Sequence, residues 1–137
     1  MKIVADTNLL IASIFWSGAP YKVVLQAVDG KLKIITSQHI LNEVRKVLQD
    51  PKEGFQLSEQ EIDDIINGIL LYAEIVNTDA RIDVVRDPKD NHIITCAMAA
   101  KAVYIITRDK DLLSLKEYAE IKIITPEEFM AIFKLSD

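Results

Sequence analysis

The chain has 137 residues, 50% hydrophobic and 27% charged, which is typical of one globular domain that buries roughly two thirds of its unfolded surface. The formal net charge of -5 and the pI near 5.0 exclude a protein that holds nucleic acid by general basic attraction. A polyanionic ligand would therefore need metal ions or a small basic patch. The single cysteine, Cys96, excludes an intramolecular disulfide and indicates a reducing compartment. We expect a single domain over residues 1–137.

The N-terminal stretch MKIVADTNLLIASIFWSGAP contains a lysine, an apolar segment and small residues, as a signal peptide does. Asp6 and Asn8 lie inside the apolar segment, which argues against that interpretation. No uninterrupted apolar run approaches the ~18–20 residues that a membrane helix needs. We therefore expect a soluble, cytoplasmic protein with no membrane partner.

Short β-branched runs alternate with segments of helical period along the chain. This alternation is typical of a parallel sheet covered by helices. The expected strands are Ile3–Ala5, Lys33–Thr36, Val103–Thr107 and Lys122–Thr125. The sequence therefore predicts an α/β fold.

Three of the expected helices have a clear start signal, a side chain that can accept hydrogen bonds from the free amides of the first turn. The signals are Ser37, Ser58 with Glu61, and Thr125 with Glu128, which precede helices beginning near residues 38, 59 and 126. Pro126 adds a proline at the first helical position. The polar loops at 15–20 and 50–57 are too short to divide the chain into two domains.

Acidic residues follow two of the expected strands. In open parallel α/β sheets the ligand crevice lies beyond the carboxyl ends of the strands, so Asp6 and Asp109 should lie near the same edge. Asp109 keeps the side-chain parity of Ile105 and Thr107, so we rank it as a primary ligand. Asp111 stands one step before the apolar run LLSL, so we expect it to cap the next helix and to be an auxiliary ligand.

Glu43 borders the buried stripe of the helix that follows Ser37, between Ile40 and Val44. Two interpretations remain open for it. One is a flanking side chain that extends to water, and the other is a functional group turned inward.

The loop DPKDN at 87–91 contains two aspartates with different expected roles. Asp90 shares the sheet-facing side of the next helix with Ile93, where it can cap the helix, bind a cation, or do both. Asp87 precedes Pro88, which favours an extended conformation at the first position of a turn.

Carboxylates that meet at one site repel one another unless a counter-charge is present. Oxygen ligands with no cysteine and no nearby histidine cluster select hard cations, so we expect Mg²⁺ or Mn²⁺. The expected ligands are Asp6, Glu43, Asp90 and Asp109, with Asp111 auxiliary.

Four motifs occur in order along nearly the whole chain: VADTN, SQHILNEV, DPKDNHIITCA and YIITRDKDLL. Together they resemble PIN-domain nucleases, in particular the toxin (VapC-like) components of bacterial and archaeal toxin–antitoxin pairs. The resemblance implies a three-layer sandwich in which a small parallel sheet lies between helices.

The resemblance also implies an activity, partners and site residues. The activity is Mg²⁺- or Mn²⁺-dependent endoribonuclease hydrolysis of RNA by an activated water, with no covalent enzyme intermediate. The implied partners are the RNA substrate, a cognate antitoxin and a second copy of the chain. The implied catalytic, metal-binding residues are Asp6, Glu43, Asp90 and Asp109, with Asp111 as a less regular fifth acid and with Asn8 and Thr107 orienting the carboxylates. No role follows for residues 50–85.

Cations flank the expected ligands. They are Lys89, Arg108 and Lys110, and they are candidates for contacts to substrate phosphates. The alternative is a surface role in which they pair with neighbouring aspartates.

Other chemistry-bearing side chains have weaker support. His39 and His92 have no recognisable triad context, so we expect surface or boundary positions for both. Trp16 is expected to pack against its own domain or a dimer partner, with base stacking as the alternative. Cys96, in an apolar helical stretch, is expected to be a buried filler.

Two other classes of function remain open. A phosphoaspartate domain, of receiver or dehalogenase type, also places an aspartate after the first strand, but here Asp6-Thr7-Asn8 lacks a second aspartate. A catalytically silent binding module would keep the fold and act through a protein partner. The complete set of four main acids favours the enzyme, because a silent module would have no chemical need for them.

Overall fold

The computed structural model describes residues 1–78 and 91–135. Its strands form one sheet in the order β3-β2-β1-β4-β6-β5. The strands are β1 (Lys2–Ala5), β2 (Lys33–Thr36), β3 (Ala73–Ile75), β4 (Tyr104–Ile106), β5 (Glu117–Tyr118) and β6 (Ile121–Ile124). The helices are α1 (Thr7–Phe15), α2 (Ala19–Val28), α3 (Gln38–Gln49), η1 (Pro51–Glu53), α4 (Glu59–Tyr72), α5 (Asn91–Ala100), α6 (Lys110–Leu115) and α7 (Pro126–Leu135).

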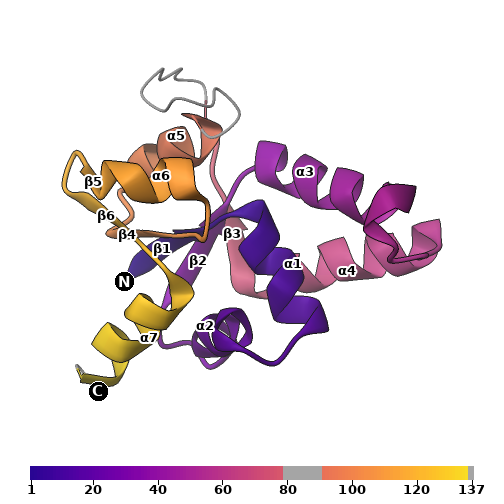
Figure 1. Cartoon of the computed structure of the whole chain (residues 1–137), viewed down its shortest axis with the longest axis horizontal. Helices are drawn as coiled ribbons and strands as arrows, with labels where there is room; N and C mark the ends of the chain where they lie inside the picture. Colours follow the sequence, from indigo (N-terminus) through magenta and orange to yellow (C-terminus); the bar gives the residue numbers. More distant parts are fainter. Residues whose placement is uncertain (79–90, 136–137) are drawn as a thin grey trace.

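Helices cover both faces of the sheet (Figure 1). On one face α5 packs against β1, β2 and β4, and α6 packs against β6. On the other face α2 contacts β2, α1 and α7. The paired helices α3 and α4 extend to one side (Figure 1). The expected α/β three-layer sandwich is confirmed.

The strand order reverses at β1. The central strand β1 is parallel to both β2 and β4, and β4 is parallel to β6. The chain first proceeds outward from β1 through β2 to β3, and then crosses to β4 on the other side of β1. In such sheets the crevice outside the carboxyl ends of the strands at the reversal is the usual ligand site. Here those ends are Ala5 and Ile106.

The expected strands are all present, although the third is shorter than predicted. The sequence did not indicate β3 or β5. Both are short edge strands, and β5 pairs antiparallel with β6 through only two residues. Such short strands have too few residues to show an alternating pattern.

The predicted helix starts are confirmed at the level of single hydrogen bonds. Ser37 accepts from the amide of Ile40. Ser58 and Glu61 form the reciprocal capping box that begins α4. Thr125 accepts from the Glu128 amide at 3.1 Å, and the Glu128 carboxylate accepts from the Thr125 amide at 3.2 Å. Capping of this kind satisfies amides that the helix itself leaves unpaired.

The buried face of α5 is centred on Ile93, Ala97 and Ala100. Met98 lies at the border of this face and is 40% exposed. Cys96 is buried as expected, and burial raises the pKa of its thiol to about 12. A thiol with so high a pKa is a poor nucleophile at neutral pH.

Among the described residues, no single helix is long and apolar enough to cross a membrane. Helices α1 and α2 meet the length and composition requirement only as a pair, across a bend of 91°.

Candidate metal centre

Asp6 lies directly after β1 and caps α1. Its Oδ1 accepts a hydrogen bond of 2.8 Å from the amide of Leu9. The side chain is buried, because the strand end and the helix start enclose it. A carboxylate in this position serves the helix with one oxygen and has a further oxygen available for another partner.

Thr107 connects the two acids that follow the central strands. Its hydroxyl donates to Oδ2 of Asp6 and accepts from the backbone amide of Asp109 at 2.9 Å. The residue is fully buried at the end of β4. The orientation of Asp6 and the backbone position of Asp109 therefore depend on the same hydroxyl group.

Asp109 is the N-cap of α6. Its Oδ2 accepts from the amide of Leu112 at 2.9 Å, and its backbone is extended where the helix begins at Lys110. The expectation that Asp111 caps this helix is wrong, because Asp111 already lies in the first helical turn. Only the residue immediately before the turn has the extended backbone that a cap needs.

Glu43 is turned toward the acids from α3. Its Oε1 accepts from the Thr7 hydroxyl at 3.0 Å and lies 2.9 Å from Nε2 of His92. Thr7 begins α1 and His92 lies in α5, so helices α1, α3 and α5 meet at this carboxylate. Of the two interpretations left open for Glu43, the structure favours the inward one.

A histidine pair adjoins Glu43, contrary to the expectation of no nearby histidine cluster. The rings of His39 and His92 are stacked, with centroids 3.8 Å apart and planes 8° from parallel. His39 stands one helical turn before Glu43 on α3, so the two side chains share a face. That spacing is visible in the sequence, but the approach of His92 from α5 is not.

The histidine cluster as it stands is not arranged to hold one ion. One ligand atom from each of His39, Glu43 and His92 lies within 4.8 Å of the others. However, imidazole binds a metal along the lone pair in its ring plane, and stacked parallel rings cannot both direct that lone pair at one point. The site better suited to a cation therefore lies on the other side of Glu43.

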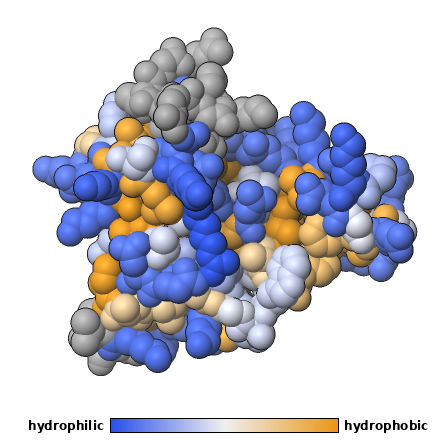
Figure 2. All heavy atoms as spheres, in the orientation of Figure 1, coloured by the Kyte–Doolittle hydropathy of each residue, from blue (hydrophilic) through white to orange (hydrophobic). Residues whose placement is uncertain are grey.

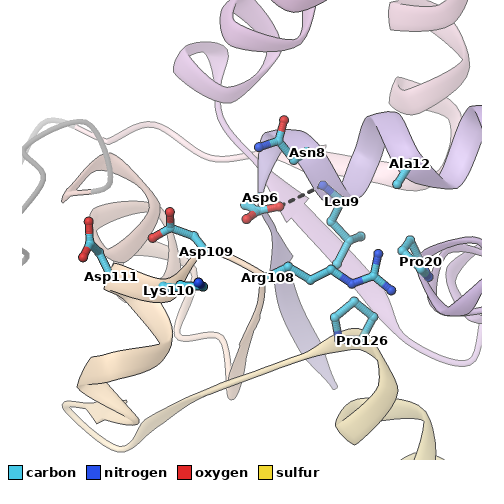
Figure 3. A pocket seen from close by; sticks show the side chains of 10 residues that line it. All are labelled: Asp6, Asn8, Leu9, Ala12, Pro20, Arg108, Asp109, Lys110, Asp111 and Pro126. Atoms are coloured by element: carbon cyan, nitrogen blue, oxygen red, sulfur yellow. Dashed lines mark hydrogen bonds between the residues drawn. The ribbon is translucent and has the colours of Figure 1, made fainter.

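Asp6, Glu43 and Asp109 line a common hollow of about 90 Å³ together with Thr7, Asn8 and His92. A larger hollow of about 690 Å³ adjoins it and shares Asp6, Asn8 and Asp109 (Figure 3). Figure 2 shows hydrophilic side chains gathered between α6 and α1, where the larger hollow opens. The expected convergence of these three acids is therefore present in the structure.

Burial raises the pKa of Asp6. Hydrogen bonds from Thr107 and Leu9 oppose this effect, while the charges of Asp109 and Glu43 add to it. Burial also raises the pKa of Glu43, but the hydrogen bonds from His92 and Thr7 and the charges of both histidines outweigh it and lower the pKa overall. Glu43 is therefore compensated, whereas among the described residues the hydrogen bonds to Asp6 do not offset the effect of its burial.

This donor set fits a hard divalent cation. Among the described residues, Oε2 of Glu43 and Oδ1 of Asp109 accept no hydrogen bond, so each has an oxygen available. A cation would also remove the mutual repulsion that contributes to the raised pKa of Asp6. Oxygen ligands of this kind suit Mg²⁺ or Mn²⁺.

Basic side chains flank the site, as the sequence predicts for Arg108 and Lys110. Arg108 and Lys110 line the larger hollow (Figure 3). The Arg108 guanidinium pairs with Glu127 at the start of α7. The hydrogen bond from this guanidinium lowers the pKa of the Glu127 carboxyl. Asp90 and Lys89 lie outside the described residues.

The neighbour of Asn8 donates a hydrogen bond to a carboxylate of this site. Among the described residues, Thr7 donates to Glu43, while Asn8 has an exposed side chain at the wall of both hollows. Trp16 is 62% exposed and packs edge-on against Phe15, with the ring centroids 6.1 Å apart. It therefore packs only partly against its own domain.

The family model described as PIN domain matches residues 2–111. The chain belongs to the PIN-domain family. Members of this family are generally nucleases, so membership excludes the phosphoaspartate alternatives. No curated protein sequence matches this PIN domain closely enough to count as a relative.

Two solved structures illustrate the shared fold. One is the structure of VapBC2 from Rickettsia felis bound to a DNA fragment from its promoter. The matched chain is 17% identical, with a TM-score of 0.62, and the match covers 90% of this chain and 97% of that chain. The other is the RRP44 PIN domain of T. brucei, which is 11% identical with a TM-score of 0.52. The match covers 98% of this chain and 81% of that chain. At these identities the likeness concerns the fold alone.

Proposed function

We propose that this PIN domain is a Mg²⁺- or Mn²⁺-dependent endoribonuclease that hydrolyses phosphodiester bonds. Its proposed catalytic and metal-binding residues are Asp6, Glu43, Asp90 and Asp109, with Asp111 auxiliary. The observation that carries this proposal is that Asp6, Glu43 and Asp109 line one hollow at the reversal point of the sheet. The orientation of Asp6 by Thr107 supports it further.

The chemistry divides between the ion and the protein. A bound divalent ion activates a water molecule and stabilises the charge that develops on the phosphate and the leaving oxygen. The protein holds the carboxylates in place through helix amides and the Thr107 hydroxyl. Because these donors are already oriented, little reorganisation is needed when the substrate arrives.

The larger hollow is the proposed place for the nucleotide beside the cleaved bond. Its wall combines apolar side chains such as Leu9 and Pro20 with the cations Arg108 and Lys110. Lys89 is a third proposed phosphate contact. Since the chain has a formal net charge of -5, attraction to RNA would depend on these few basic side chains and on the bound divalent metal ion.

The proposed biological role is the toxin component of a toxin–antitoxin pair. The shared fold with VapBC2 supports a protein partner of antitoxin type, although that likeness concerns the fold. A homodimer and a cytoplasmic location are part of this proposal, and a buried, unpaired Cys96 is compatible with a reducing compartment.

The test is RNA cleavage by purified protein with Mn²⁺ or Mg²⁺ on a broad panel of RNAs. Asp6→Asn and Asp90→Asn should each reduce cleavage by more than the roughly 100-fold that loss of a ligand's hydrogen-bond partner can cost. Asp87→Asn is the matched control, three positions away in the sequence and outside the described residues, and it should have a small effect.

Two results would contradict the proposal. One is the absence of metal-dependent cleavage across the whole panel, which would favour the catalytically silent binding module. The other is wild-type cleavage by the Asp90 variant, which would remove Asp90 from the proposed ligand set.

A further inference from the structure

We propose that His92 is a positioning residue for Glu43. Its ring N–H and the Thr7 hydroxyl occupy Oε1 of Glu43, which leaves Oε2 as the oxygen that binds the ion. This inference rests on the proposed function, since it places an ion among Asp6, Glu43 and Asp109.

The two donors reach the same oxygen from different helices. The Thr7 hydroxyl lies 3.0 Å from Oε1, and Nε2 of His92 lies 2.9 Å from it. A carboxylate can only accept hydrogen bonds, so Nε2 of His92 must bear a proton. Among the described residues no donor reaches Oε2. The two oxygens of Glu43 are therefore chemically distinct before any ion binds.

The surroundings hold the His92 ring in place. The His92 side chain is 12% exposed, compared with 33% for Glu43, so the donor is more enclosed than its acceptor. The His39 ring stacks on the His92 ring with centroids 3.8 Å apart. His39 therefore limits rotation of the imidazole, while His92 limits rotation of the carboxylate.

The geometry favours a hydrogen bond over direct metal binding by His92. A separation of 2.9 Å between Nε2 and Oε1 is a usual hydrogen-bond distance. A metal-binding nitrogen would instead present a lone pair, which a carboxylate oxygen at that distance would repel. Hydrogen bonds to metal ligands typically contribute 10–100-fold to metal affinity or activity, which sets the expected size of the effect.

The experiment compares the same substitution in the two stacked rings. His92→Phe and His39→Phe both keep an aromatic ring, but only His92→Phe removes the N–H that reaches Glu43. Mn²⁺ affinity is measured by titration calorimetry without RNA, and thermal unfolding without metal checks that each variant folds. We expect about tenfold weaker Mn²⁺ binding for His92→Phe and a change within about twofold for His39→Phe. His92→Gln, which restores an N–H, should recover most of the loss.

The outcomes separate this inference from the proposed function. Equal losses in both phenylalanine variants would overturn it, because His39 would then act as a ligand. Unchanged affinity in His92→Phe, or no recovery in His92→Gln, would also overturn it, and so would a wild-type protein that binds no Mn²⁺. If the wild type binds Mn²⁺ but cleaves no RNA, the proposed function fails while the His92 comparison still stands.

Discussion

Thr107 shows how much of the candidate site depends on one side chain. Its hydroxyl is fully buried, donates to Asp6 and accepts from the Asp109 amide. Valine has nearly the same shape but cannot form either hydrogen bond. The Asp6 oxygen would then remain buried without this donor, and the part-buried Asp109 amide would lose its acceptor.

Thr107→Val should therefore lower the free energy of unfolding by about 1–3 kcal/mol and weaken Mn²⁺ binding about tenfold or more. Urea unfolding and titration calorimetry measure the two effects. Thr36→Val is the matched control, because Thr36 is also fully buried at a strand end but its hydroxyl has no hydrogen-bond partner among the described residues. That variant should be neutral or stabilising, and an equal loss in both variants would contradict the role given to Thr107.

Asp6 should make the metal-free protein less stable as the pH rises. Because the pKa of Asp6 is raised in the folded state, the folded protein retains a proton that the unfolded chain releases. Stability is therefore lost as the pH rises from the unfolded value of about 4 through the raised pKa.

Asp6→Asn should remove this loss while keeping the helix cap, since asparagine also caps helices. In EDTA at neutral pH, we expect the free energy of unfolding of the variant to exceed that of the wild type by about 0.5–2 kcal/mol. The advantage should shrink as the pH falls toward about 4. Urea unfolding across this pH range measures it, and a wild type that is more stable than the variant at neutral pH would contradict the argument.

At the level of helices and strands, two of the acids are positioned where a strand ends and a helix begins. Asp6 follows β1 and caps α1, and Asp109 follows β4 and caps α6. In both cases the aspartate lies within three residues of the strand end and directly before the helix. Local sequence therefore predicts where these two acids lie, and helix start signals were predicted equally well at Ser58 and Thr125.

Asp109 combines two roles that substitution can separate. Asp109→Asn should keep the cap of α6 and so keep stability within about 0.5 kcal/mol, whereas Asp109→Ala should lose about 1 kcal/mol. Both should lose metal-dependent RNA cleavage, because neither has a carboxylate. Urea unfolding together with the cleavage assay tests this.

Ser58→Ala serves as a comparison from a distant part of the chain. It removes the cap of α4, which lines neither hollow, so it should cost about 1 kcal/mol and leave cleavage unchanged. Equal stability of Asp109→Asn and Asp109→Ala would show that the cap of α6 contributes little.

The whole molecule is acidic, so the ion should affect both stability and RNA binding. An ion that binds only the folded state stabilises it by about 2.7 kcal/mol at a concentration 100 times its Kd. We expect thermal unfolding to shift upward with MnCl₂ relative to EDTA, and RNA binding to be lost in EDTA. Asp6→Asn should show little of the upward shift. An equal shift in wild type and Asp6→Asn would place the ion elsewhere.

The sequence alone determined the α/β class, the main strands, the helix caps at Ser37, Ser58 and Thr125, and the position of acids after β1 and β4. These features depend on neighbouring residues, and short-range periodicity and capping chemistry are sufficient to predict them. The pairing of Ser58 with Glu61 is one example, since three residues separate the partners.

Only the tertiary structure decided which side chains surround Glu43. Thr7 comes from α1 and His92 from α5, and the hydrogen bond from Thr7 spans 36 positions of the chain. The edge strands β3 and β5 likewise form only because neighbouring strands pair with them. Contacts of this kind depend on how helices pack on the sheet, and no local pattern of residues records that packing.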